Sequence, residues 1–206
     1  MNMIKAIFFD FDGVMTIDKT GTQSICKYIS EIYNIDKNIF EKEYRKYNND
    51  LLYGITTHEK IWGNICQNIN ENIPISILYD SFENTPINNE MHDFVKNVKS
   101  QNIKTALITD NKIDRIKIIT EKYNLNKIFD IIIVSAEIGF GKDNEKIFET
   151  VLDKLNVKSN ECIFIDNQEK NLIIPKNMGI NTIFFEDEEK DLEKLKYETK
   201  KYGINI

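Results

Sequence analysis

The chain has 206 residues, a formal net charge of −6, and only eight glycines and three prolines. This length suits one large domain, or one domain with an insertion, and it can bury a core without disulfides or structural zinc. The low glycine and proline content argues against collagen-like, linker-rich and turn-dense all-β chains. Nucleic-acid-binding proteins usually carry a basic stripe, and this sequence has none, so we expect no nucleic-acid partner.

Cysteine usage and hydropathy indicate the compartment. The three cysteines are far apart and no pair has metal-ligand spacing, which suits a reducing environment. No apolar run reaches the roughly 18 residues of a membrane span, and the run at residues 6–9 is too short for a signal peptide. We therefore expect a cytoplasmic protein with no membrane partner. The sequence leaves open whether it is a monomer or a homodimer.

Five short apolar runs predict the strands of a sheet. Each has four to six residues and lacks polar alternation, which is typical of strands buried on both faces. Amphipathic helical patterns separate most of them. This alternation predicts an α/β fold, a doubly wound, Rossmann-like parallel sheet of about five strands with helices on both faces. The predicted strands are residues 4–9, 104–108, 131–134, 162–165 and 182–185.

The segment between the first two predicted strands is far longer than one crossover helix requires. It carries four helical patterns before the helix expected at 89–101, and these lie at 22–33, 37–52, 56–70 and 75–83. We therefore predict an inserted helical bundle over residues 16–86, and a sheet domain formed by residues 1–15 and 87–206. A solvated terminal helix is expected over 186–201. Pro175 predicts a short or kinked helix after the fourth strand, because proline removes a helical hydrogen bond.

Chemically reactive side chains follow the predicted strands. Asp10 and Asp12 follow the first strand, Thr109 ends the second, Lys142 lies beyond the third, and Asp166 follows the fourth. Ligands of an open parallel sheet bind beyond the carboxyl ends of its strands, so these side chains should converge. Three carboxylates at one edge repel unless a cation offsets their charge, and Mg²⁺ prefers oxygen ligands. The pattern predicts a site for a divalent cation at this edge.

Four short motifs stand in order over residues 4–185. They are FFDFDGVMT at 8–16, ALITDN at 106–111, Lys142 followed by Ile147-Phe148, and IFIDNQEKN at 163–171. Together they resemble the motifs of the haloacid dehalogenase superfamily of aspartate-nucleophile phosphohydrolases. The third motif departs from the family's Lys-Pro-Asp-Pro pattern, since Asp143-Asn144-Glu145 follows the lysine. The inserted bundle lies where the family has a helical cap in the first cap position, as in its subfamily IA.

The resemblance implies roles for the first two motifs. Asp10 would be the nucleophile that forms an aspartyl-phosphate, and a covalent route splits one hard step into two. Asp12 would be the general acid and base. Thr109 would hydrogen-bond a phosphoryl oxygen, with backbone N–H groups near Asp110 and Asn111 also binding the phosphate.

The third and fourth motifs would supply the electrostatics. Lys142 would offset negative charge on Asp10 and the phosphoryl group. Mg²⁺ would be held by the carboxylates of Asp10 and Asp166 and by the backbone carbonyl of Asp12. Asn167 stands where the family usually has a second acid that supports the metal through water or hydrogen bonds. It carries one negative charge fewer, so we expect weaker metal binding.

The implied function is a Mg²⁺-dependent phosphomonoester hydrolase acting on a small phosphorylated metabolite, such as a sugar phosphate or nucleotide. Asp12 favours a phosphatase or phosphomutase, because the family's dehalogenases lack an acid there. A β-phosphoglucomutase-like phosphomutase and a non-catalytic binding or regulatory protein stay open as alternatives. In the expected cap, Arg45, Lys46, His58 and Lys60 could meet an anionic substrate, and His58, near the Gly54 turn, is the contact we favour.

Overall fold

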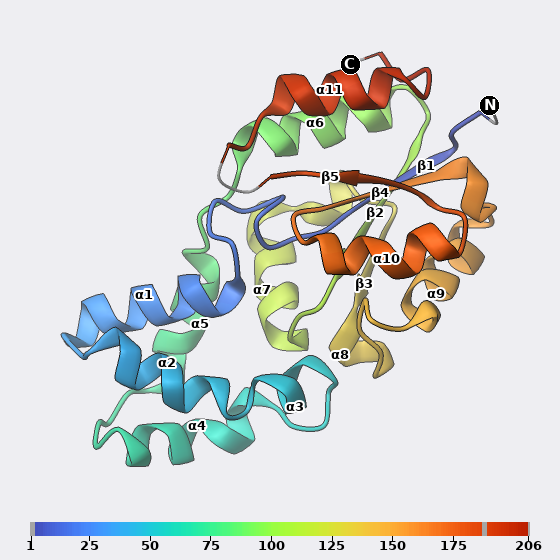
Figure 1. The fold of residues 1–206 in the computed structure, drawn as a ribbon. Coiled ribbons are helices and arrows are strands. Elements are labelled where there is room, and N and C mark those ends of the chain that lie inside the picture. The colour runs from blue at the N-terminus through green and yellow to red at the C-terminus, as the bar shows by residue number, and fades with distance from the viewer. Residues whose placement is uncertain (1–2, 187–188, 206) are drawn as a thin grey trace.

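The computed structural model describes residues 3–186 and 189–205. A five-stranded parallel sheet with the order β3-β2-β1-β4-β5 forms one half of the molecule, and a helical bundle forms the other half (Figure 1). This confirms the predicted α/β fold. The strands are β1 Ala6–Phe9, β2 Lys104–Thr109, β3 Ile131–Val134, β4 Cys162–Asp166 and β5 Asn181–Phe184.

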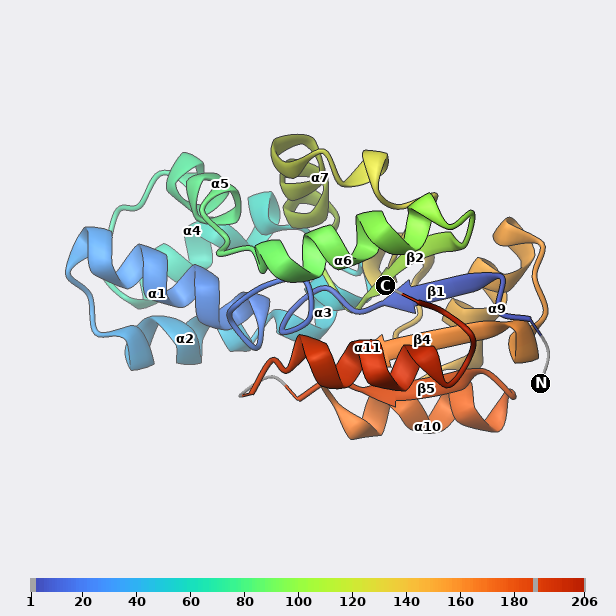
Figure 2. The same ribbon diagram turned by 90° about the horizontal axis from the view of Figure 1, so that it is seen from above.

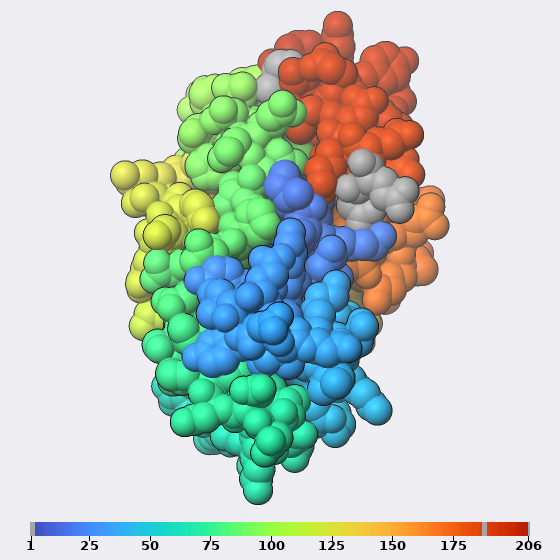
Figure 3. Space-filling model, turned by 90° about the vertical axis from the view of Figure 1, so that its left-hand side faces the viewer, coloured from blue at the N-terminus to red at the C-terminus, as the bar shows by residue number. Residues whose placement is uncertain are grey.

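Helices cover both faces of the sheet and fill the bundle. Figure 3 shows the bundle, in blue and teal, gathered at one end of the molecule. The bundle helices are α1 Gly21–Tyr33, α2 Lys37–Arg45, α3 Asn48–Leu52, α4 His58–Asn68 and α5 Ile75–Glu83. The remaining α-helices are α6 Asn89–Ser100, α7 Ile113–Tyr123, α8 Ser135–Ile138, α9 Glu145–Leu155, α10 Glu169–Asn177 and α11 Leu192–Lys200. None of the helices in the described residues is long and apolar enough to cross a membrane.

Side chains of β1 alternate between two hydrophobic clusters, one on each face of the sheet. Ile7 and Phe9 pack with residues of α6, α7 and α11, whereas Ala6 and Phe8 pack with residues of α9. Figure 2, seen from above, shows α6 and α11 lying over this first face. All four side chains are fully buried, which explains why the central strand reads as a continuous apolar run rather than an alternating one.

Several helix boundaries differ from the predicted ones for local reasons. The helix expected over 37–52 is divided, because Lys46 and Tyr47 donate to carbonyls only three residues back and tighten the backbone. The short α8 was not predicted. The terminal helix begins at Leu192, where Asp191 caps it, and residues 187–188 of the predicted range lie outside the described residues. Helix α10 is nine residues long and ends soon after Pro175, as expected.

The two chain crossings between sheet and bundle lie side by side. Thr16 and Ile87 form an isolated antiparallel bridge. Beside it, Ile17 N–H donates to the Pro86 carbonyl at 2.8 Å, and Asn88 N–H donates to the Met15 carbonyl at 2.9 Å. These bonds lie at the boundary expected for the inserted segment, so the insertion is closed at its base by backbone hydrogen bonds.

Asparagine ends several helices in a left-handed conformation, and Asn124 after α7 shows this with φ 53°. A residue with a Cβ atom but no local hydrogen-bonding side chain is disfavoured there, whereas glycine is not. We expect Asn124→Ala to lower the free energy of unfolding by about 1 kcal/mol, and Asn124→Gly to lower it by less. Urea unfolding of both variants measures this. Equal losses would show that the Asn124 side chain, rather than its backbone conformation, stabilises the helix end.

Candidate active site

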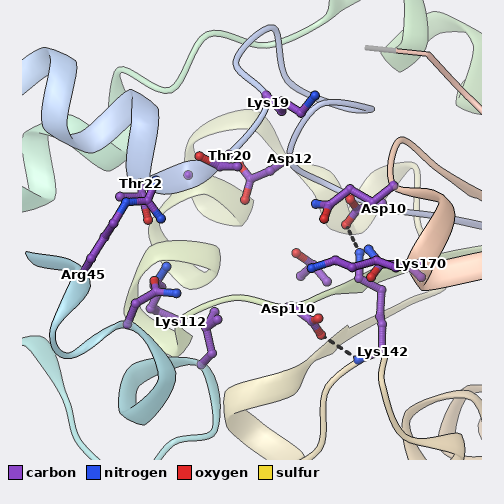
Figure 4. A pocket seen from close by; sticks show the side chains of 16 residues that line it. Asp10, Asp12, Lys19, Thr20, Thr22, Arg45, Asp110, Lys112, Lys142 and Lys170 are labelled. Atoms are coloured by element: carbon purple, nitrogen blue, oxygen red, sulfur yellow. Dashed lines mark hydrogen bonds and ion pairs between the residues drawn. The ribbon is translucent and has the colours of Figure 1, made fainter. Parts of the chain in front are cut away.

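A cleft of about 220 Å³ lies between the carboxyl ends of the strands and the first bundle helices (Figure 4). Its sheet side combines strand-end residues with residues of the loops and helices that follow the strands. These are Asp10, Asp12, Thr109, Asp110, Lys112, Lys142, Gln168, Lys170 and Asn171. The bundle side consists of Lys19, Thr20, Gly21, Thr22, Arg45, Asn48 and Leu52.

Lys142 joins two carboxylates at the floor of the cleft. Strands β1 and β4 are neighbours, with Phe9 paired to Ile165, so Asp10 and Asp166 leave the sheet side by side. The Nζ atom of Lys142 lies 2.7 Å from Asp10 Oδ1 and 2.7 Å from Asp166 Oδ2. All three side chains are nearly inaccessible to solvent. The structure therefore brings these three predicted site residues together.

Burial and charge shift the protonation of this cluster. Burial raises the pKa of Asp10, the nearby charge of Asp166 raises it further, and Lys142 partly opposes both effects. Burial alone would lower the pKa of Lys142, but its attraction to Asp10 and Asp166 outweighs this and raises that pKa above its ordinary value. Lys142 is therefore a fixed positive charge, and it makes the pair of buried acids tolerable.

The oxygen atoms around Lys142 suit a hard divalent cation. Asp166 Oδ1 accepts hydrogen bonds from the Gln168 N–H at 2.7 Å and from Asn171 Nδ2 at 3.1 Å, which fix the orientation of its carboxylate. In residues 3–186 and 189–205, no group of three or more His, Cys, Asp or Glu side chains could hold a metal. Mg²⁺ is commonly held by one or two carboxylates together with waters and substrate phosphate. The neighbouring carboxylates of Asp10 and Asp166 fit that requirement.

Asn167 packs under the loop that follows β1. Gly13 has φ 86°, and a Cβ atom there would lie 2.1 Å from Asn167 Nδ2, so the turn after Asp12 requires glycine on both counts. Asn167 is buried and follows Asp166 directly. Its position beneath the first motif is consistent with a supporting role for a metal.

We expect Asn167→Asp to tighten Mg²⁺ binding several-fold, because a carboxylate in this position adds negative charge next to Asp166. Isothermal titration of the protein with MgCl₂ measures the change. The matched control is Gln168→Glu, which adds the same charge to the neighbouring residue at the cleft wall. Unchanged Mg²⁺ affinity, or an equal gain in both variants, would contradict a specific effect at Asn167.

Asp12 is held by Arg115, which no sequence motif marks. Arg115 Nη2 donates to Asp12 Oδ1 at 2.8 Å, and Arg115 Nη1 donates to Asp12 Oδ2 at 2.9 Å. Asn111 Nδ2 donates to Asp12 Oδ2 at 2.8 Å and to Thr109 Oγ1 at 3.1 Å. The structure thus joins Asp12 to Thr109 through the Asn111 side chain.

Asp110 and Asn111, which we expected near the phosphate, make hydrogen bonds within the protein instead. Asn111 is buried and does not line the cleft, and its backbone N–H donates to Ser135 Oγ at 3.0 Å, so it is not available to a phosphoryl oxygen. Asp110 lines the cleft, and its Oδ1 accepts from the Lys142 N–H at 2.9 Å. Burial raises the pKa of Asp110. These residues fix the positions of Asp12 and Lys142.

His58 is not in the cleft, contrary to our expectation. Its side chain is fully buried, and its two ring nitrogens lie 2.7 Å from Tyr44 Oη and 2.7 Å from Asp114 Oδ2. Tyr44 belongs to the bundle and Asp114 to α7. Its ring also packs against Phe82. His58 therefore links the bundle to the sheet half, a role that depends on packing between distant segments.

We expect His58→Ala to lower the free energy of unfolding by about 2 kcal/mol or more, because it leaves the buried Tyr44 hydroxyl without its partner and opens a cavity. Denaturant unfolding measures this loss, and the KM for an accepted substrate should stay within about twofold. His92→Ala, at the chain's other histidine, is the control. An unchanged free energy of unfolding combined with a raised KM would instead support the original prediction that His58 contacts the substrate.

Three cations that line the cleft were not singled out as site residues from sequence: Lys19, Lys112 and Lys170. The buried Arg115, which holds Asp12, was not singled out either. Lys112 is nearly buried, and burial, with repulsion from Arg115, lowers its pKa to about 8. No sequence pattern marks these residues. Among the bundle cations expected to meet a substrate, Arg45 lines the cleft, whereas Lys46 pairs with Glu43 on an exposed surface.

The family model for haloacid dehalogenase-like hydrolases matches residues 4–179. The chain therefore belongs to this family of hydrolases, which confirms the resemblance at the level of the superfamily. Rat (Rattus norvegicus) bifunctional epoxide hydrolase 2 is 30% identical over 130 residues, covering 61% of this chain and 24% of that protein. The phosphorylated carbohydrates phosphatase of Thermotoga maritima is 28% identical over 91 residues, covering 42% of this chain and 40% of that protein. The chain spans about a quarter of the length of the epoxide hydrolases it matches.

Solved structures share the fold over nearly the whole chain. The enzyme BT-2542 of Bacteroides thetaiotaomicron superposes with a TM-score of 0.76 at 17% identity, covering 94% of this chain and 99% of that one. Its complex with magnesium and inorganic phosphate gives 0.70 at 18% identity, covering 88% and 93%. The L-2-haloacid dehalogenase of Xanthobacter autotrophicus, with chloropropionic acid covalently bound, gives 0.66 at 15% identity, covering 87% and 76%. At these identities the likeness establishes the fold alone.

Proposed function

We propose that the chain is a Mg²⁺-dependent phosphomonoester hydrolase with Asp10 as its nucleophile. The observation that carries this proposal is the buried Asp10 carboxylate at the floor of a cation-lined cleft, paired through Lys142 with Asp166. An acid placed in this way can accept a phosphoryl group, and the neighbouring lysine can offset the charge that develops. The likeness to a magnesium and phosphate complex and to a carbohydrate phosphatase supports the same reaction class.

The reaction would proceed in two displacements at phosphorus. In the first, a carboxylate oxygen of Asp10 attacks phosphorus, the bond to the ester oxygen breaks, and Asp12 gives its proton to that oxygen. In the second, Asp12 takes a proton from a water molecule that attacks the aspartyl-phosphate, which releases phosphate and regenerates Asp10. Lys142 and the hydroxyl of Thr109 stabilise the transferring group. Asp10, Asp166 and the Asp12 carbonyl would hold Mg²⁺, which would supply positive charge for phosphate binding.

The cleft favours a small anionic substrate. Its volume of about 220 Å³ and its cover of bundle residues leave room for a metabolite such as a sugar phosphate or nucleotide. Lys19, Arg45, Lys112 and Lys170 make the cleft locally positive in a chain whose net charge is −6. The proposed reaction requires neither a nucleic acid nor a membrane as a partner.

We expect Mg²⁺-dependent phosphate release from a panel of p-nitrophenyl phosphate, sugar phosphates, nucleoside monophosphates and glycerol phosphate. Asp10→Asn should lower kcat by at least about 10³-fold, because the amide is a poor phosphoryl acceptor. EDTA should abolish turnover, and added Mg²⁺ should restore it. Released phosphate is measured under each condition.

The matched control is Asp93→Asn, an exposed acid on α6 that forms a surface ion pair with Lys96, and it should leave turnover unchanged. Equal activity of the Asp10 and Asp93 variants would contradict the nucleophile assignment. Interconversion of sugar phosphates with little free phosphate would instead indicate the phosphomutase alternative. No turnover of any ester would indicate a binding or regulatory protein.

A further inference from the structure

Arg115 occupies an unusual position for an arginine. It lies in the first turn of α7, and its side chain is completely inaccessible to solvent. Its guanidinium holds both oxygens of Asp12, at 2.8 and 2.9 Å, and Nη1 also donates to Asn111 Oδ1 at 3.0 Å. Asp12 itself lines the cleft. A buried cation therefore controls the direction of the one cleft acid assigned to proton transfer.

The same guanidinium is enclosed from two sides. The ring of Phe11, the residue between the two motif aspartates, lies 5.6 Å from Arg115 Cζ. On the opposite element, the first residue of α1 is Gly21, where a Cβ atom would lie 2.4 Å from Arg115 Nη1. The contact leaves no room for a side chain at Gly21. Arg115 is therefore fixed between the loop after β1 and the first helix of the bundle.

This arrangement matters for the chemistry proposed for Asp12. A guanidinium fork binds a carboxylate with two parallel hydrogen bonds, which set its orientation more strictly than an ammonium would. Proton transfer to a leaving group requires the acid within hydrogen-bond reach, and a displacement of about 1 Å can cost about 10²-fold in rate. The rate of proton transfer would therefore depend on the orientation of the Asp12 carboxyl group, which Arg115 sets.

We propose that Arg115 is a positioning residue for Asp12, and that its contact with Gly21 makes this positioning depend on the seating of α1. The inference rests on the proposed function, since it assigns how the general acid of that reaction is oriented. An arginine that only stabilised the fold would, when replaced, lower the activity towards all phosphate esters alike. A positioning residue affects most the esters that need a proton on their leaving oxygen.

Two substrates separate these possibilities. The p-nitrophenolate ion leaves without protonation, whereas the alkoxide of a sugar or glycerol phosphate needs a proton from Asp12. We expect Arg115→Met to lower kcat/KM for the best alkyl phosphate of the panel by about 10²-fold, and for p-nitrophenyl phosphate by less than about fivefold. Arg115→Lys keeps the charge and loses the fork, so it should show the same selectivity with a smaller loss. The pH profile for the alkyl ester should also change in Arg115→Met.

Gly21→Ala provides a second variant in case Arg115→Met does not fold. It keeps Arg115 and introduces a methyl group against the guanidinium, and Gly21 has no left-handed backbone angle that would strain alanine. It should again reduce turnover of the alkyl ester more than that of p-nitrophenyl phosphate. The matched control is Lys122→Met, an exposed cation in the last turn of α7. It should leave both rates unchanged.

Each result is decisive. Equal losses on the two esters in the Arg115 and Gly21 variants would overturn the positioning role and leave the proposed function intact. Absence of turnover by the wild-type chain would overturn the proposed function itself, and with it the role of Asp12. A selective loss on the alkyl ester in folded variants, verified by thermal melting, would support the proposal.

Discussion

The Lys142 ammonium between Asp10 and Asp166 is the interaction on which the rest of the site depends. Two neighbouring parallel strands bring their terminal acids to one point, and burial there would be unfavourable for two uncompensated carboxylates. Lys142 resolves this conflict within the chain, and the Asp110 carboxylate fixes its backbone N–H. The fold thus keeps Asp10 buried, paired with a lysine and at the floor of the cleft.

The bundle contributes through a few specific contacts with the sheet half. His58 reaches Asp114 at the start of α7, and Ser135 Oγ donates to the Leu52 carbonyl at 2.7 Å. Gly21 rests against Arg115, which in turn holds Asp12. The same interface between bundle and sheet half therefore forms the cleft wall and sets the orientation of Asp12. In the proposed reaction, this coupling would give the inserted helices a role in orienting Asp12 as well as covering the site.

Charge is distributed unevenly over the molecule. The chain is acidic overall, yet lysines and an arginine from both halves gather at the cleft. Burial lowers the pKa of Lys112 to about 8, and a bound anion would favour its protonated form. Local positive potential of this kind attracts anionic metabolites against a repulsive global field.

The sequence by itself determined the strands, the inserted helices and the convergence of Asp10, Lys142 and Asp166, because apolar runs report burial and parallel strands end at one edge. Only the tertiary structure decided the surroundings of helix-borne side chains. Arg115 hydrogen-bonds to Asp12, which lies 103 residues away in the sequence, and His58 hydrogen-bonds to Asp114, which lies 56 residues away. Helical periodicity shows which face is apolar, but the partner of a buried polar side chain depends on how helices dock, and that information is not local in the sequence.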